Sequence, residues 1–233
     1  MGKRIIQQRR GKGTATFRVR RHAYTVRLSY PNIEGKGKVI KLISDAGHTS
    51  PLALINVGNK FFYNVAPEGL EERQEISMGK GAEIKPGNII PLGDAPIGTN
   101  LCNIEIVPYC GGRLVRASGI SAVVTKKVAG RVALMLPSKH EKLFPENARA
   151  TIGIVAGGGR TEKPFVKAGH KWYLMKARNK LYPRTSPIKM NSVNHPFGGG
   201  RGKNMGKSGI APRWAPPGRK VGLLRPRKTG RGK

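Results

Sequence analysis

Both ends of this 233-residue chain lack acidic residues altogether. No Asp or Glu precedes Glu34 or follows Glu162, whereas residues 1–33 carry nine Lys and Arg and residues 163–233 carry 19. Segments of one charge sign repel themselves, and their many Gly and Pro residues leave too little apolar surface to offset the entropy of ordering. We therefore expect both ends to fold only against a polyanionic partner.

Long apolar runs are missing as well. No stretch approaches the roughly 18 consecutive apolar residues that a membrane-spanning helix needs, and the first residues, Met1 to Gln7, contain no apolar signal core. The basic segments are too rich in Gly and Pro for the long amphipathic helices that lie on a membrane surface. We expect a cytoplasmic protein with no membrane partner.

Cysteine is scarce, since Cys102 and Cys110 are the only two. Their spacing, without a neighbouring His or Cys cluster, does not match the usual pairs of zinc ligands. We expect two buried or bystander thiols, no bound metal and no cofactor.

The chain has a large excess of positive charge, with 44 Lys and Arg against 12 Asp and Glu and a net charge of +32. Most of the excess lies in the two ends, because residues 34–162 combine 16 basic residues with all 12 acidic ones. Nucleic acid is the expected partner of such segments. A chromatin-like or transcriptional DNA binder is the alternative, although no helix-turn-helix, zinc or basic-zipper signal supports it. A solvated basic tail without function is a second alternative.

Aromatic residues interleaved with the basic ones favour RNA. In a flexible tail they would be an exposed apolar liability, whereas against RNA each can stack on an unpaired base at roughly 1 to 3 kcal/mol. They are Phe17, Tyr24, Trp172, Tyr173, Tyr182, Phe197 and Trp214.

The middle of the chain has the pattern of a β-rich domain. Gly58-Asn59 predicts a tight hairpin, Lys85 to Asn88 predicts a type II turn, and Phe144 to Ala150 suggests one short helical turn. The spacing of about ten residues between runs favours small barrels or sandwiches, with a domain boundary near 84–92. The expected strands are residues 38–43, 52–57, 60–65, 101–107, 114–117, 121–126, 131–136 and 151–155.

Two glycine-rich patterns have alternative interpretations. The segment 202–208 looks like a phosphate-binding loop, but it has three residues where four are needed between the glycines, so we reject nucleotide hydrolysis. The runs 157–160 and 198–201 predict close approach of the backbone to something bulky, with Arg160 and Arg201 placed to meet phosphate; a plain flexible loop is the alternative.

His195 is the histidine with the clearest hypothesis. No carboxylate lies anywhere in its basic segment, so a Ser, His and Asp relay cannot assemble locally. A hydrogen bond to RNA is favoured over a role as general base. His22, His48, His140 and His170 have no metal-like spacing and stay unassigned.

Residues 190–200 read Met-Asn-Ser-Val-Asn-His-Pro-Phe-Gly-Gly-Gly. Together with residues 8–13, 153–169 and 217–223, this motif resembles the universal large-subunit ribosomal protein two family over essentially the whole chain. The residues of this motif, including Phe197 and the Gly-Gly-Gly-Arg loop, resemble those of the archaeal and eukaryotic branch of the family. The chain length is similar to that of archaeal members.

The resemblance implies an all-β fold with an OB-fold barrel at 36–85 and an SH3-like barrel at 86–170. Long, basic, irregular extensions would occupy residues 1–35 and 171–233. It also implies a structural constituent of the large ribosomal subunit, with large-subunit rRNA and other ribosomal proteins as partners. The extensions would reach the peptidyl transferase region and support subunit association and tRNA binding, which makes the small subunit and tRNA further partners. No catalytic residue is expected.

The chain departs from the family pattern at a few positions. Ser186-Pro187 replaces Arg-Gly, and Lys189, Ser192 and Asn194 replace Ala or Thr, Pro, and an acid. The loss of the acid at Asn194 weakens any scheme in which a carboxylate tunes His195, so catalysis becomes still less favoured. RNA anchoring survives these changes.

The residues expected to bind RNA are basic, aromatic or hydrogen-bonding side chains of the two extensions and the glycine-rich loops. They are Arg9, Arg10, Lys12, Arg18, Arg20, Arg21, Arg160, Lys163, Lys167, Trp172, Arg178, Asn191, His195, Arg201, Lys203, Lys207, Arg213, Trp214, Arg219, Lys220, Arg225 and Arg227.

Overall fold

The computed structural model describes residues 2–19, 24–201 and 204–226. It divides into two compact units. The β unit comprises Arg21–Val166, and the basic unit combines Met1–Arg20 with Lys167–Lys233. The two ends of the chain therefore belong to one unit.

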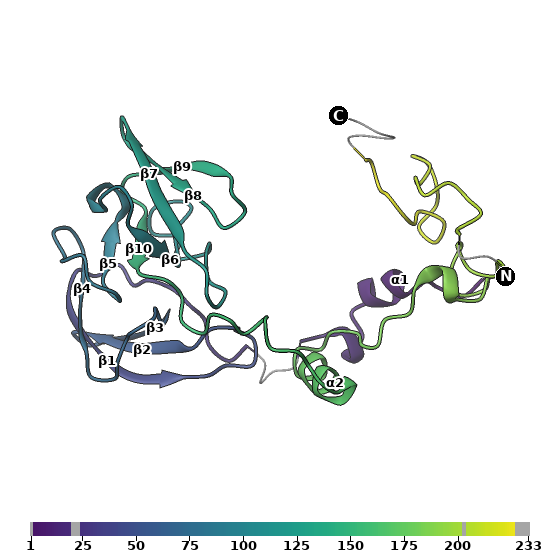
Figure 1. Ribbon diagram of the computed structural model, residues 1–233, viewed down its shortest axis with the longest axis horizontal. Coiled ribbons are helices and arrows are strands. Elements are labelled where there is room, and N and C mark those ends of the chain that lie inside the picture. The colour runs from purple at the N-terminus through teal and green to yellow at the C-terminus, as the bar shows by residue number, and fades with distance from the viewer. Residues whose placement is uncertain (1, 20–23, 202–203, 227–233) are drawn as a thin grey trace. The chain divides into compact units, whose positions relative to one another are not determined.

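The β unit is built on ten strands within its described residues, in the sheet order β3-β2-β1-β4-β5-β10-β6-β7-β8-β9 (Figure 1). Neighbouring strands are antiparallel except β4 and β5, which meet in parallel at Met78 and Ile89. The all-β prediction is confirmed. The strands are β1 (Gly35–Ile43), β2 (Leu52–Val57), β3 (Lys60–Val65), β4 (Glu75–Met78), β5 (Ile89–Pro91), β6 (Asn100–Cys102), β7 (Ala122–Val128), β8 (Arg131–Met135), β9 (Glu141–Pro145) and β10 (Arg149–Ile152).

Local turn chemistry explains the strand connections. β2 and β3 pair from Val57 opposite Lys60, and the connecting Gly58 has the positive φ of 57° that a two-residue hairpin needs. Gly87 has a φ of 99° and the Asn88 N–H donates to the Lys85 carbonyl at 3.2 Å, as in a type II turn. Both predicted turns are confirmed.

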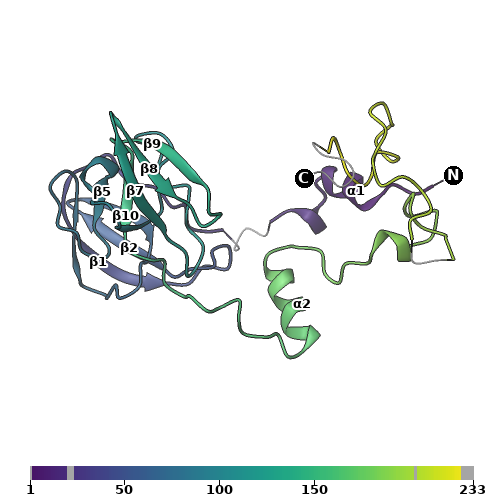
Figure 2. The same cartoon turned by 45° about the horizontal axis from the view of Figure 1, so that its top comes forward.

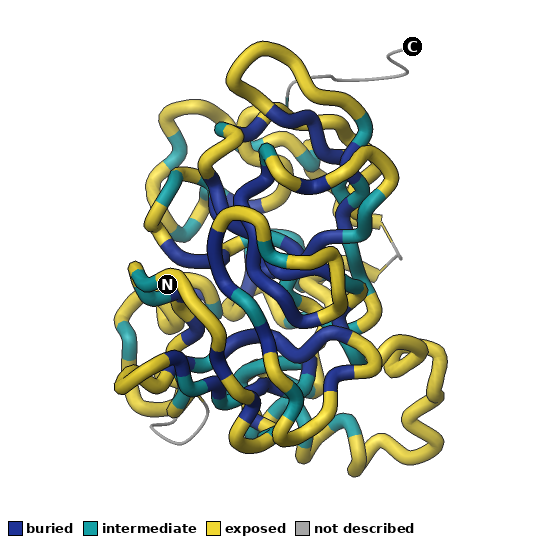
Figure 3. Tube along the Cα trace, turned by 90° about the vertical axis from the view of Figure 1, so that its left-hand side faces the viewer, coloured by how far each residue is buried: buried dark blue, intermediate teal, exposed yellow. Residues whose placement is uncertain are grey.

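Two hydrophobic clusters form the core of the β unit. One gathers Val39, Ile55 and Ile76 around the first strands, and the other is centred on the later strands and includes Phe144. Leu52, at the start of β2, belongs to the second cluster, so the two halves share the β2–β3 hairpin. Figure 3 shows the buried residues in dark blue along the chain. The predicted division at 85/86 stays a prediction.

Several sequence predictions in the β unit differ from the structure. Strands β4, β5 and β9 were not predicted, because each has only three to five residues. The strand predicted at 114–117 is only an isolated bridge between Leu114 and Ile104, and the strand predicted at 151–155 instead runs from Arg149 to Ile152.

The predicted helical turn at Phe144 to Ala150 is wrong: β9 ends at Pro145 and β10 begins at Arg149. Phe144 is held in the sheet because it lies opposite Val132 and is 1% exposed.

The strand predicted at 101–107 ends early. β6 stops at Cys102, and Asn103 has a φ of 47°, which an extended strand does not allow. This bend sends Glu105 into the core, where it is fully buried.

The predicted N-terminal extension, residues 1–35, is divided between the two units. From residue 24 onward the chain belongs to the β unit, where Leu28 forms a bridge with Tyr63. The Tyr30 hydroxyl donates to the Asn103 carbonyl at 2.6 Å and lies 2.7 Å from the Thr151 hydroxyl. Burial raises the pKa of this phenol well above its usual value, so it stays protonated and available as a donor.

A buried ion pair holds the same region together. Arg149 donates to both carboxylate oxygens of Glu105, at 2.9 and 3.2 Å, and to the Pro31 carbonyl at 2.6 Å. The backbone N–H groups of Tyr109 and Gly111 also donate to Glu105. Every oxygen of this buried carboxylate is therefore compensated, which a buried charge requires.

The basic unit has short helices and mostly irregular backbone. Its elements are α1 (Ile6–Gly11), η1 (Ala15–Phe17), α2 (Ala168–Ala177) and η4 (Pro187–Lys189); Figure 2 shows α1 and α2 from a second angle. The sequence patterns did not indicate the helix at residues 168–177. α2 contains no buried residue, and the predicted domain boundary at 170/171 falls inside it.

Replacing Arg149 with Met is expected to lower the free energy of unfolding by about 3 to 5 kcal/mol, because the Glu105 carboxylate would stay buried without its cation. The matched control is Lys85→Met, which removes an exposed ion pair with Glu83 and should leave stability nearly unchanged. Urea denaturation of the full chain, followed by circular dichroism, measures both. Equal, small losses would contradict the assigned role of the pair.

At about pH 8, iodoacetamide should label Cys110 in the folded chain and spare Cys102. Both thiols are free, but Cys102 is buried and Cys110 exposed. Burial raises the pKa of the Cys102 thiol to about 12, so its reactive thiolate is rare at this pH. Peptide mass spectrometry before and after unfolding in urea measures the labelling, and prompt labelling of Cys102 in the folded chain would contradict its burial.

Candidate nucleic-acid interface

The basic unit has no internal counterions. It contains 25 Lys and Arg and no Asp or Glu. Its cations therefore cannot be neutralised by side chains of their own unit. An outside polyanion is the chemically matched partner.

Most residues expected to bind RNA are exposed. Of the 22, 18 lie among the described residues, and 15 of these are exposed, including Arg160 and Lys163 in the β unit. Arg178 and Lys220 are partly buried, and His195 is buried. The remaining four, Arg20, Arg21, Lys203 and Arg227, lie outside the described residues, as do the first two positions of the 202–208 segment.

The two ends of the chain are hydrogen-bonded to each other. The Lys3 backbone N–H donates to the Val193 carbonyl at 2.8 Å, and the Asn179 side chain donates to the Ala15 carbonyl at 3.5 Å. Ile5, His195 and Val221 are the buried residues of the described part of this unit. The segments near residues 5, 195 and 221 thus contribute one buried side chain each.

Gly198 and Gly199 are required by the chain's own backbone, whereas Gly200 has open space around it. A Cβ at Gly198 would collide with the carbonyl oxygens of Met190 and Asn191. Gly199 has a φ of 82° and donates its N–H to the Met190 carbonyl at 3.0 Å. The bulky neighbour predicted from this glycine run is therefore the preceding loop.

The glycine run at 157–160 also packs against the protein itself. A Cβ at Gly119 would come within 2.7 Å of the Gly158 backbone. Arg160 donates to the Ser118 hydroxyl at 3.1 Å, and its side chain stays exposed. The predicted close approach of the backbone is confirmed at both runs. In both cases the neighbour is the protein itself, so neither glycine run alone indicates RNA binding.

His195 has a defined hydrogen-bonding state. It is 5% exposed, and its Nδ1 accepts the backbone N–H of Phe197 at 3.1 Å. The Phe197 ring lies 5.2 Å away, centroid to centroid. Burial lowers the pKa of the imidazole, which favours the neutral ring at neutral pH. With no carboxylate in this unit, the geometry gives His195 no partner for acid–base relay chemistry.

The aromatic residues of the basic unit differ in their surroundings. Trp214 is 87% exposed, with the Arg213 guanidinium 5.2 Å from its ring. Trp172 contacts Tyr173 edge to face at 4.9 Å and lines a small cavity with Phe17. Trp214 is available for stacking, whereas Trp172 is partly used inside the unit.

A basic pocket in the β unit has no counterpart among the residues predicted from the sequence. Its cavity of about 400 Å³ is lined by Arg27, His48, Arg113 and Arg116, among others. Arg116 donates to the Gly112 carbonyl at 3.0 Å and lies 3.4 Å from Nε2 of His48, whose Nδ1 is 2.6 Å from an Asp45 oxygen. These residues are up to 89 positions apart along the chain, so no sequence motif links them. Guanidinium groups around such a cavity suit a phosphate.

Among residues 2–19, 24–201 and 204–226, no three His, Cys, Asp or Glu side chains are grouped as metal ligands. No helix of the described chain is both long and apolar enough to cross a membrane.

Comparisons with known proteins agree on one family. The family model described as Ribosomal Proteins L2, C-terminal domain, matches residues 85–215. Proteins named large ribosomal subunit protein uL2 from Methanococcoides burtonii, Korarchaeum cryptofilum and Natronomonas pharaonis are each 45% identical to this chain. The alignments cover 99 to 100% of this chain and 97 to 100% of the relatives. An OB-fold domain followed by an SH3-like domain fits this family and the observed strands. The chain thus belongs to the universal L2 family of ribosomal proteins, in its archaeal form.

Proposed function

We propose that this protein is a structural constituent of the large ribosomal subunit and that it binds large-subunit rRNA through its basic unit. The carrying observation is the unit's 25 Lys and Arg without a single Asp or Glu. Each cation that meets a phosphate releases condensed counterions, which drives binding. Arg side chains can hold two phosphate oxygens at once.

The finer assignment rests on the family resemblance. The resemblance implies that the loop around His195 approaches the peptidyl transferase region and that the protein supports subunit association and tRNA binding. Large-subunit rRNA, neighbouring ribosomal proteins, the small subunit and tRNA are the partners, in cytoplasmic ribosomes. The role is architectural, since His195 has no carboxylate partner in its unit.

The affinity of the full chain for large-subunit rRNA should fall by roughly 10³ to 10⁵ between about 50 and 200 mM KCl if about six to ten cations meet phosphates. Filter binding over a salt series measures this dependence. A nearly flat titration would exclude the mechanism, and equal affinity for duplex DNA of the same length would favour the DNA-binding alternative.

A triple variant locates these contacts. Replacing Arg9, Arg10 and Lys12 with Gln should reduce the slope of log affinity against log salt by about two to three. The matched control replaces Arg131, Lys139 and Lys142, exposed cations of the β unit, and should leave the slope unchanged.

Trp214→Leu is expected to weaken rRNA binding about 5- to 150-fold, corresponding to one lost base stack of roughly 1 to 3 kcal/mol. Phe61→Leu is the control, because Phe61 is also exposed, at 65%, but lies on β3 of the β unit. Filter binding at one fixed salt concentration compares the two. Equal affinities of both variants and the parent chain would show that Trp214 does not stack on RNA.

A further inference from the structure

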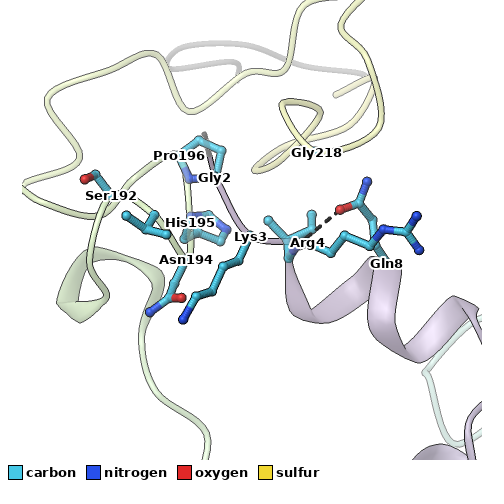
Figure 4. Close-up of a pocket in the computed structure, with 11 residues that line it drawn as sticks. Gly2, Lys3, Arg4, Gln8, Ser192, Asn194, His195, Pro196 and Gly218 are labelled. Atoms are coloured by element: carbon cyan, nitrogen blue, oxygen red, sulfur yellow. Dashed lines mark hydrogen bonds between the residues drawn. The ribbon is translucent and has the colours of Figure 1, made fainter.

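The loop that carries His195 borders a cavity of about 300 Å³ within the basic unit (Figure 4). Residues 2–5 and Gln8 line one side, and residues 192–196 and Gly218 line the other. The cavity is therefore formed by the two ends of the chain together. Its volume is about ten times the ~30 Å³ that one water molecule occupies in the liquid.

The walls of this cavity are held by backbone contacts. The Lys3 N–H donates to the Val193 carbonyl at 2.8 Å, and the Gln8 side-chain oxygen accepts the Ile5 N–H at 3.2 Å. Ile5 is 7% exposed and anchors the segment. Lys3 and Arg4 are thus placed beside the His195 loop by the fold of the N-terminal segment.

The hydrogen bond at Nδ1 decides what His195 offers to this cavity. Because Nδ1 accepts the Phe197 N–H at 3.1 Å, it carries no proton. The neutral imidazole then bears its proton on Nε2, which acts as a donor. His195 lines the cavity, and Figure 4 shows its ring between Lys3 and Pro196.

The groups around the cavity match one chemical class of ligand. Lys3, Arg4 and His195 all line it, and the unit has no Asp or Glu side chain that could occupy it from within. An anion with several acceptor oxygens satisfies all three groups. We propose that this cavity holds one phosphodiester group of an RNA strand, with Lys3 and Arg4 supplying the charge and His195 Nε2 supplying a directed hydrogen bond. This assignment rests on the proposed rRNA binding and makes residues 2–8 part of the binding site.

Charge neutralisation and the His195 hydrogen bond should contribute to RNA affinity in different ways. Lys3 and Arg4 neutralise phosphate charge, so each affects the salt dependence of binding. Burial lowers the pKa of His195 and keeps the ring neutral near pH 7.5, so its hydrogen bond adds affinity without releasing counterions. Loss of the ring should therefore weaken binding at every salt concentration by a similar factor.

The test measures filter binding of the full chain to large-subunit rRNA over a KCl series near pH 7.5. His195→Leu should weaken binding about tenfold, as expected for one hydrogen bond to a charged group, with the salt slope unchanged. His195→Gln should retain most of the affinity, because its amide donor can replace Nε2–H. Lys3→Gln should lower the slope by about 0.7 to 0.9. His170→Leu, at an exposed histidine on α2, is the control and should match the parent chain.

A double-variant comparison tests the shared ligand. The effects of Lys3→Gln and His195→Leu should be non-additive if both groups hold the same phosphate, whereas Arg18→Gln and His195→Leu should add. Parent-like binding by His195→Leu would overturn the assignment. A loss of two or more from its salt slope would also overturn it, since that would show a structural role for the ring. A flat salt dependence of the parent chain would instead refute the proposed RNA binding itself.

Discussion

The segregation of charge along the chain determines how the rest of the molecule can fold. All 12 acidic residues lie between residues 34 and 162, so only the β unit can pair cations with carboxylate side chains of its own. The buried pair of Glu105 and Arg149 is the clearest result, because it joins the loop after β6 to β10 and, through Pro31, to the arm before β1. The basic unit has no such means of compensation.

The two units consequently depend on different forces. Two hydrophobic clusters stabilise the β unit, while the described part of the basic unit buries only Ile5, His195 and Val221. Three side chains cannot offset the entropy of ordering two long, glycine-rich segments. The short helices and the hydrogen bond between Lys3 and Val193 therefore describe a shape that phosphate contacts would have to stabilise. Under the proposed function, attraction between these cations and RNA phosphates stabilises the basic unit, which has no hydrophobic core among its described residues.

The turns and the longer strands are predicted well from the sequence, because they depend on the conformational preferences of neighbouring residues. The hairpin at Gly58 and the turn at Gly87 follow from the φ values that their residues permit, and the longer strands follow from runs of β-branched residues. β4, β5 and β9 escape this logic because each is too short for a local pattern to identify, and pairing with neighbouring strands makes them part of the sheet. The helical turn predicted at Phe144 failed for the same reason.

The candidate site shows the same limit more sharply. Charge and aromatic content predict that the two extensions bind RNA, but they do not predict which segments of the extensions meet. Nothing in the sequence indicates that Lys3 lies beside the loop of His195, nor that His48 lies beside Arg116, because such contacts depend on the fold. Composition thus identifies the class of partner, whereas placing individual donors needs the structure.

The loop around His195 is shaped by its own glycines. Gly198 packs on Met190 and Asn191, and Gly199 packs on Ser192, so close packing within the loop explains these two glycines without a ligand. That shape places the Phe197 N–H on Nδ1 and leaves Nε2 as the donor, although the preceding residue is Asn194 and not an acid. A carboxylate is therefore not needed to set the tautomer, because the backbone sets it. The same constraint argues for an architectural histidine, whose value lies in the direction of its hydrogen bond and not in its capacity to gain a proton.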